Sequence, residues 1–150
     1  MSFPLPPPMR LALDLARQAA SSGEVPVAAV IMRGDEVVAT AANAMCSGSD
    51  PTAHAEMEAI RAAAARLGAQ RLDDCDLYVT LEPCAMCAGA ISHARLRRLY
   101  YGAEDPKGGA VAHGPRFFTQ PTCHHRPEIY GGIGEAEAAA LLRDFFVSRR

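Results

Sequence analysis

The sequence predicts a protein of the α/β class, a sandwich of helices packed on a sheet, in one domain over residues 1–150. Short apolar runs typical of strands alternate along the chain with longer stretches whose apolar side chains recur at helical spacing. The chain has 150 residues, 49% of them hydrophobic, which is enough to bury a core without disulfide bonds. Because no repeat or linker interrupts this pattern, we expect a single domain.

The N-terminal third of the chain predicts a helix followed by a two-stranded hairpin. Residues 10–21 carry apolar side chains at helical spacing, and Gly23 ends this helix. Residues 25–32 are almost wholly apolar, which is typical of a strand covered on both faces, and residues 36–42 form its hairpin partner. The small, polar residues 43–50 predict a loop.

The middle of the chain predicts two helices separated by a strand. Asp50-Pro51 is a helix-entry signal, and the apolar stripe that follows it stops at Gly68. Residues 77–81 predict the next strand. Glu82-Pro83 then opens a second helix, with the proline near its first position.

The last third of the chain predicts less regular structure and a terminal helix. Prolines and glycines interrupt it repeatedly, so its regular elements are short. In chain order the segments are a strand over residues 99–101 ended by Gly102, a glycine-rich loop over 104–114, an irregular segment over 116–127, a short strand over 128–130 and a helix over 135–148.

Two short motifs carry side chains that can bind a metal. His54 and Glu56 lie two residues apart, and Cys84 and Cys87 lie three apart after Pro83. One imidazole and two thiols give Zn²⁺ three ligands and leave a position for water, whereas a structural zinc site normally has four protein ligands. Glu56 can act as the general acid and base that accepts and delivers the protons of such a water. The residues therefore predict a catalytic zinc site for hydrolysis.

The spacing of these motifs predicts where they lie on helices. Residues two apart on a regular helix point about 200° from each other, so His54 and Glu56 reach one metal only from a first turn. Cys84 and Cys87 share one face of the first turn of the next helix. We therefore expect both motifs at helix N-termini, whose partial positive charge favours the thiolate form of cysteine.

Two other uses of these residues stay open. The Cys84-x-x-Cys87 pair could be redox-active, but His54 and Glu56 would then have no role. A non-catalytic zinc-stabilised binding module would need a fourth ligand, and none of the remaining cysteines has zinc-motif spacing: Cys46, Cys75 and Cys123. The segment Cys123-His124-His125 is either a second metal site or a packed loop between prolines.

The composition limits the partners and the compartment of the protein. A net charge of -2 and a sequence pI of about 6.2 exclude a global basic field, so any nucleic-acid contact must come from a local patch. The chain has five cysteines, an odd number, and neither a signal-peptide pattern nor an apolar stretch long enough to span a bilayer. We therefore expect the reducing cytoplasm and no membrane partner.

His54-x-Glu56 followed by Pro83-Cys84-x-x-Cys87 matches the signature of zinc nucleobase deaminases. With the segments around it, nearly the whole chain resembles the bacterial tRNA-specific adenosine deaminases: Glu24–Val27, Asp50–Glu56, Leu77–Gly89 and Asp144–Phe146. The resemblance implies the cytidine-deaminase-like fold, a three-layer α/β/α sandwich whose five-stranded mixed sheet has its last strand parallel to its neighbour. It also implies a homodimer, one Zn²⁺ per chain, and conversion of adenosine to inosine at the wobble position of a tRNA anticodon.

The same resemblance assigns roles to individual residues. It implies that zinc is held by His54, Cys84 and Cys87, and that Glu56 is the proton shuttle. Contacts with the nucleoside or the surrounding RNA are implied for Asn43, the backbone amide of Ala55, Asp105, Lys107, Phe145 and Phe146, with Arg149 and Arg150 near the anticodon loop.

Two departures from the family pattern bear on the substrate. Ala28 stands where these enzymes usually have glycine, and its methyl group is expected next to the base pocket, which it could trim. The chain ends at Arg150 without the longer basic tail of some relatives, which is expected to weaken RNA binding slightly. The nearest alternative is the same chemistry on a free nucleobase or nucleoside such as guanine, cytosine or cytidine.

Overall fold

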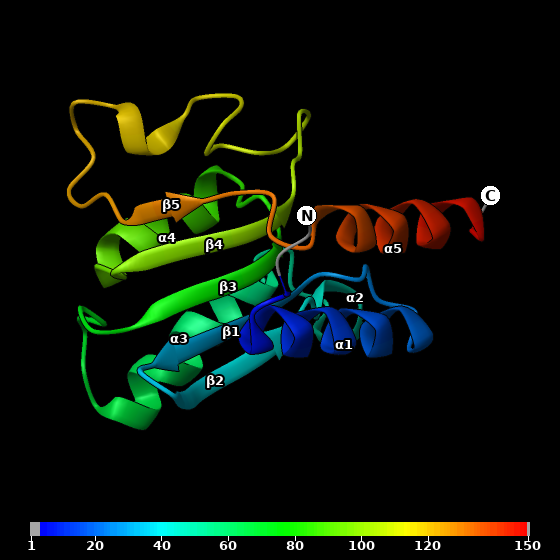
Figure 1. Cartoon of the computed structure of the whole chain (residues 1–150), viewed down its shortest axis with the longest axis horizontal. Coiled ribbons are helices and arrows are strands. Elements are labelled where there is room, and N and C mark those ends of the chain that lie inside the picture. Colours follow the sequence, from blue (N-terminus) through cyan, green and yellow to red (C-terminus); the bar gives the residue numbers. More distant parts are fainter. Residues whose placement is uncertain (1–3, 150) are drawn as a thin grey trace.

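The computed structural model describes residues 4–149, in which one five-stranded sheet is covered by helices on both faces (Figure 1). In spatial order the strands are β2 (Glu36–Ala42), β1 (Ala28–Arg33), β3 (Asp76–Leu81), β4 (Arg98–Ala103) and β5 (Glu128–Tyr130). Strand β1 is antiparallel to β2 and β3, whereas β3, β4 and β5 run parallel. The mixed sheet and its parallel last strand are therefore confirmed.

The helices form the two outer layers of the sandwich. They are α1 (Pro7–Ser21), α2 (Met45–Gly48), α3 (Ala55–Leu67), α4 (Ala85–Ala94) and α5 (Glu135–Val147), with a 3₁₀ turn, η1 (Phe117–Thr119). Helices α1 and α5 lie on one face of the sheet, and α3 and α4 lie on the other (Figure 1). The three-layer α/β/α architecture follows from this arrangement.

Strand β1 is buried on both faces, as its continuous apolar run predicts. Ala29 and Ile31 join the apolar cluster beneath α3 and α4, whereas Val30 and Met32 join the cluster beneath α1. Successive side chains of a strand point to opposite faces, so Ala28 points with Val30 toward the α1 layer. This orientation places its methyl group away from the face that carries α3 and α4.

Two expected boundaries around the first motif are wrong. Residues 43–50 contain the short helix α2, and Asp50-Pro51 does not open α3, which begins at Ala55 with His54 as its N-cap. The Asp50 carboxylate instead accepts hydrogen bonds from the Thr52 amide (2.9 Å) and hydroxyl (2.8 Å). Asp50 therefore stabilises a local turn, and α3 begins five residues after it.

Smaller boundary differences occur in the second half of the chain. Helix α4 begins at Ala85, one residue after its N-cap Cys84, so Pro83 lies just outside the helix. Strand β4 continues through Gly102 instead of ending there, because that glycine serves close packing and not a turn: a Cβ on it would lie 2.6 Å from the Thr80 carbonyl oxygen. The irregular segment 116–127 contains η1, and the predicted β5 and α5 are confirmed.

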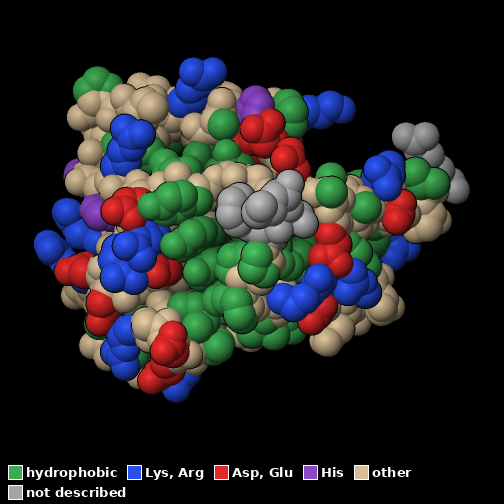
Figure 2. All heavy atoms as spheres, in the orientation of Figure 1, with side chains coloured by type: hydrophobic (Ala, Val, Ile, Leu, Met, Phe, Trp, Pro, Cys, Tyr) green, Lys and Arg blue, Asp and Glu red, His purple; other side chains and the backbone are tan. Residues whose placement is uncertain are grey.

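The surface shows acidic and basic side chains intermingled. On the face seen in Figure 2, Lys and Arg side chains lie beside Asp and Glu side chains around the hydrophobic side chains over the sheet, in keeping with the net charge of -2. Within residues 4–149 no helix has the length and apolar character needed to cross a bilayer.

Candidate active site

One edge of the sheet gathers residues from distant segments around a cavity of about 210 Å³. The C-terminal ends of β2, β3 and β4 meet the start of antiparallel β1 there. The lining comes from these strand ends and from the loops and helix starts beside them: Val25, Val27, Asn43, His54, Glu56, Leu81, Glu82, Cys84, Asp105 and Gly108. Open α/β sheets bind ligands at this edge, beyond the carboxyl ends of their strands.

A second hollow, of about 370 Å³, lies between residues 4–6 and 132–134. Its lining consists of proline, leucine, isoleucine and glycine, so it offers no acid, base or metal ligand. The ionisable groups therefore select the smaller cavity as the candidate site.

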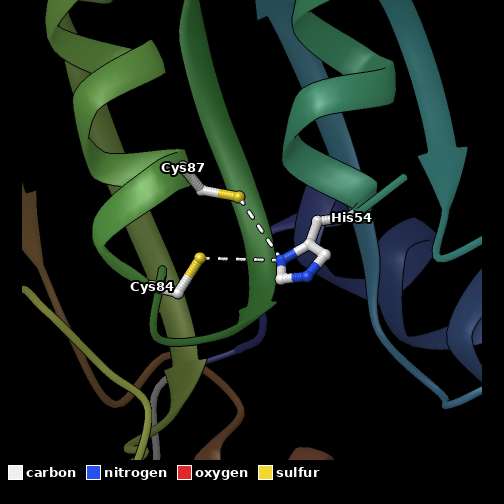
Figure 3. A group of neighbouring side chains, drawn as sticks. All are labelled: His54, Cys84 and Cys87. Carbon is white, nitrogen blue, oxygen red and sulfur yellow. Dashed lines mark hydrogen bonds between the residues drawn. The ribbon is translucent and has the colours of Figure 1, made fainter. Parts of the chain in front are cut away.

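The predicted metal ligands converge at this cavity from two helix N-termini (Figure 3). The Nδ1 atom of His54 lies 3.6 Å from each sulfur of Cys84 and Cys87. A tetrahedral Zn²⁺ with ordinary Zn–N and Zn–S bonds separates such donors by about 3.6 Å, so the donor set and its spacing fit zinc. Among the described residues, these three form the one group of histidine, cysteine and carboxylate side chains close enough to share a metal.

The two thiols of this group are electrostatically coupled. Hydrogen bonding to Cys87 lowers the pKa of Cys84 to about 5 despite its partial burial. The same hydrogen bond, together with burial, raises the pKa of Cys87. One thiolate is therefore available at neutral pH without a metal, and a bound divalent cation would favour ionisation of the second thiol as well.

Glu56 is the acid and base candidate and lines the same cavity. It lies in the first turn of α3, two residues after the N-cap His54, as the motif spacing predicts. Its side chain is almost completely buried, and this burial raises the pKa of the Glu56 carboxyl to about 7. A carboxyl with a pKa close to the operating pH can both accept and return a proton.

Asn43 and Ala55 are joined to each other beside the metal ligands. The Oδ1 atom of Asn43 accepts a hydrogen bond from the Ala55 amide at 2.8 Å, and the Asn43 side chain is buried. The amide that the resemblance assigns to base binding is therefore already engaged within the protein. With its oxygen used, Asn43 keeps its Nδ2 group as the hydrogen-bond donor for a ligand in the cavity.

The remaining predicted substrate contacts divide into two groups. Asp105 lines the cavity, and the exposed Lys107 lies two residues further along the same loop. Phe145 and Phe146 do not line the cavity. The buried Phe145 ring packs against the Arg149 guanidinium, whose carbon lies 4.2 Å from the ring centre, and Phe146 is 53% exposed. Arg150 lies outside the described residues.

The structure also corrects the expectation about Ala28 and decides between the two alternatives for the segment 123–125. Ala28 does not line the cavity, because its side chain faces the α1 layer, so its methyl group cannot trim the pocket. The segment Cys123-His124-His125 is packed as a loop: the Cys123 thiol donates to the His125 carbonyl (3.1 Å), and the His125 ring bonds the Leu96 carbonyl (2.7 Å). No disulfide occurs in the described part of the chain, and Cys75 lies directly before β3.

Sequence reasoning missed the residues that complete the cavity walls. Apart from Glu82, these residues have no acidic, basic or nucleophilic side chain. The set is Val25, Val27, Leu81, Glu82 and Gly108. The available signal was topological: Val25 and Val27 lie just before β1, Leu81 and Glu82 lie at the end of β3, and Gly108 lies in the loop that follows β4, all at the edge that carries the candidate metal ligands.

A three-layer α/β/α sandwich with a His/Cys/Cys cluster and a buried glutamate at one sheet edge defines a hydrolytic deaminase of the cytidine-deaminase-like class. A family model described as MafB19-like deaminase matches residues 7–150. The tRNA-specific adenosine deaminase of Agrobacterium fabrum is 56% identical over 142 residues, covering 95% of this chain and 93% of that protein. The chain belongs to the family of tRNA-specific adenosine deaminases.

Solved structures agree with this assignment. One structure, from a study of A-to-I editing by tRNA deaminases at the wobble position, is 56% identical with a TM-score of 0.88 and covers 90% of this chain and 98% of that chain. The guanine deaminase of Bacillus subtilis is 44% identical with a TM-score of 0.63, covering 65% of this chain and 62% of that chain. The predicted cytidine-deaminase-like fold is thus confirmed.

Proposed function

We propose that the protein is a zinc-dependent enzyme that hydrolyses adenosine to inosine at the wobble position of a tRNA anticodon, releasing ammonia. The observation that carries the proposal is the convergence of three zinc ligands and the buried Glu56 on one cavity, in a chain of this family. A cavity of about 210 Å³ suits a single base that has left its stack, as deaminases of nucleic acids require.

The proposed mechanism assigns each polar group of the cavity one task. His54, Cys84 and Cys87 hold one zinc ion, which when bound supplies a Lewis acid that activates water at neutral pH. Glu56 accepts one proton from the attacking water and delivers it to the purine ring nitrogen. It then accepts the proton of the hydroxyl group that has been added to the base and delivers that proton to the departing amine, which leaves as ammonia. Asn43, whose oxygen is fixed by the Ala55 amide, orients the base by donating from Nδ2.

The remaining parts of the proposal concern partners and compartment. Asp105 and Lys107 contact the anticodon loop from the loop that follows β4, and the region of Phe145 and Phe146 contacts it from α5. The whole chain acts as one domain, works as a homodimer, and meets its tRNA in the cytoplasm. Unpaired cysteines support a reducing compartment, which keeps both zinc-binding thiols available.

A direct comparison of substrates tests the proposal. The zinc-loaded protein is incubated with an anticodon stem-loop that has adenosine at the wobble position, and inosine is measured by nuclease digestion and chromatography. The same preparation is assayed for ammonia release from guanine, cytosine, cytidine and free adenosine. We expect turnover of the stem-loop and a KM that rises steeply with salt. Turnover of the free compounds alone, without salt dependence, would refute the tRNA substrate.

A free nucleobase is the second candidate substrate. The likeness to a guanine deaminase and the absence of a net positive charge favour it. Identity over nearly the full length of a tRNA-specific relative weighs more, because the guanine deaminase aligns with only 65% of this chain. The substrate comparison separates the two candidates in one experiment.

A further inference from the structure

Glu82 is a buried carboxylate that the catalytic scheme leaves without a task. It directly follows β3, lines the cavity, and has a completely buried side chain. Five N–H groups point at its two oxygens, which is an unusually full set of donors for one carboxylate. With its oxygens occupied, Glu82 cannot also accept a proton from a substrate, so its role is not that of an acid or base.

All of these donors belong to the loop over residues 104–114, and they come from both of its ends. At the start of the loop, the Asp105 amide donates to Oε1 at 3.0 Å. At its end, three consecutive amides donate to Oε2: Val111 (3.1 Å), Ala112 (3.0 Å) and His113 (3.2 Å). The His113 ring nitrogen lies 2.8 Å from Oε1. Glu82 therefore draws the two ends of the loop together and leaves residues 106–110 as its tip.

Gly109 gives independent evidence that the loop is built around this carboxylate. A Cβ on Gly109 would overlap Oε2 of Glu82, so the loop approaches Glu82 as closely as only glycine permits. The Ala110 amide also donates to the Pro83 carbonyl at 2.9 Å. The loop is thus fastened to the two residues that immediately precede the zinc ligand Cys84.

The same loop supplies one wall of the cavity. Asp105 and Gly108 line it, and the Oδ1 atom of Asp105 accepts hydrogen bonds from the amides of Lys107 (3.2 Å) and Gly108 (2.9 Å), which shapes the tip. We propose that Glu82 is a positioning residue that holds the substrate-facing loop 104–114 in fixed register with the zinc ligand Cys84. This inference rests on the proposed function for its substrate, whereas the effect of Glu82 on the position of the loop can be measured without any substrate.

The test disturbs the contact between Glu82 and the loop in two different ways and compares both variants with a matched control. Glu82→Gln keeps the side-chain size but turns an N–H group toward donors. Gly109→Ala leaves the carboxylate intact and pushes the loop away from it. Glu104→Gln changes an exposed carboxylate of the same loop and serves as the control. Each zinc-loaded protein is measured for zinc content, deuterium exchange of segment 104–114, and kcat and KM on the anticodon stem-loop.

We expect Glu82→Gln and Gly109→Ala to keep about one zinc per chain and to exchange the amides of segment 104–114 at least about tenfold faster. Their kcat/KM should fall roughly 10- to 100-fold, mainly through KM, because a displaced wall weakens binding before it affects the proton shuttle. Glu104→Gln should match the parent protein in every measurement.

Other outcomes would overturn the inference. Unchanged exchange in both variants would show that the loop holds its position without Glu82. Faster exchange with unchanged KM, or a melting temperature lowered without any change in KM, would show a purely structural carboxylate. If Glu82→Gln fails to fold, Gly109→Ala and the milder His113→Ala decide by the same criteria, and failure of all three to fold would equally show a structural role. Absence of inosine with the parent protein would refute the proposed function, whereas the exchange result would still stand or fall on its own.

Discussion

Replacement of Glu56 gives the sharpest test of the chemistry, because the cavity offers no substitute base. The other carboxylates in its lining are held by hydrogen bonds: both oxygens of Glu82 accept from five donors, and Oδ1 of Asp105 accepts from the amides of Lys107 and Gly108. General acid–base catalysis contributes about 10²- to 10⁴-fold, and Glu56 is proposed to serve successive proton transfers. We therefore expect Glu56→Ala to lower kcat/KM by roughly 10⁴-fold, which corresponds to about 5 kcal/mol of transition-state stabilisation.

The assay follows inosine in the anticodon stem-loop by single-turnover kinetics, with zinc measured on the same sample. Glu56→Ala and Glu56→Gln should both retain about one zinc per chain, since the proposed ligands are His54, Cys84 and Cys87. Residual activity within about tenfold of the parent protein would refute the shuttle role. If the parent protein retained its zinc but was as inactive as the Glu56 variants, the result would instead support a zinc-stabilised binding module.

The sign of the Glu56 pKa shift adds a stability control. Burial raises the pKa of Glu56 to about 7, so in the folded protein without metal the carboxyl binds its proton more tightly than in the unfolded chain. Ionising it above its unfolded pKa, near 4.5, therefore opposes folding. Glu56→Gln is expected not to lower the melting temperature of the chelator-treated protein at pH 8, and a lowered melting temperature would contradict the burial argument.

Three further predictions test the metal ligands, the Ala28 correction and the surface charges. His54→Ala should lose most of its zinc and its activity, because two thiolates alone do not hold a catalytic zinc. The control His93→Ala, which changes an exposed residue of α4, should retain both. Zinc content and inosine formation are measured for each variant. Ala28→Gly should lower the free energy of unfolding in urea by roughly 0.5–1 kcal/mol, because glycine weakens a strand. It should leave KM unchanged, because the Ala28 methyl group lies outside the cavity. A lowered KM would show that this methyl group does line the pocket. Hydrogen bonds from Arg10 and Arg17 (2.9 and 3.0 Å) lower the pKa of Glu137, so their stabilisation is present above the unfolded pKa near 4.5 and is lost as the pH falls through the folded pKa. Glu137→Gln should therefore lower the free energy of unfolding by less than about 1 kcal/mol at pH 7 and by nothing at pH 3, and an equal loss at both pH values would exclude the ion pairs as its cause.

The sequence predicted those features that depend on local pattern. The apolar run around Ile31 predicted a strand covered on both faces, and the spacing of His54 and Glu56 predicted a helix N-terminus, because both follow from the repeat of a strand or a helix. Asp50 was misread because its carboxylate can cap either a helix or a turn, and only the structure shows the Thr52 donors that decide between them.

Features that depend on how strands are paired could not be read from the sequence. Whether Ala28 faces the pocket or the α1 layer depends on which face of β1 carries α3, and one residue of difference reverses the answer. Likewise, Glu82 resembles an ordinary helix-entry residue until the pairing of β3 with β4 brings the loop after β4 beside it. Its five donors come from residues more than twenty positions away in the chain.

The packing of β3 links the core to the metal site. Leu77 and Val79 are fully buried in the cluster beneath α3 and α4, and this burial fixes the register of β3 against β1 and β4. A shift of one residue would turn both side chains to the opposite face of the sheet and move Cys84 along the strand direction by about 3.3 Å. Zinc sites tolerate deviations of only about 0.2 Å in ligand distance, so the shifted strand could not complete the His54–Cys84–Cys87 set. The apolar residues of β3 therefore determine the geometry of the proposed zinc site as well as the stability of the fold.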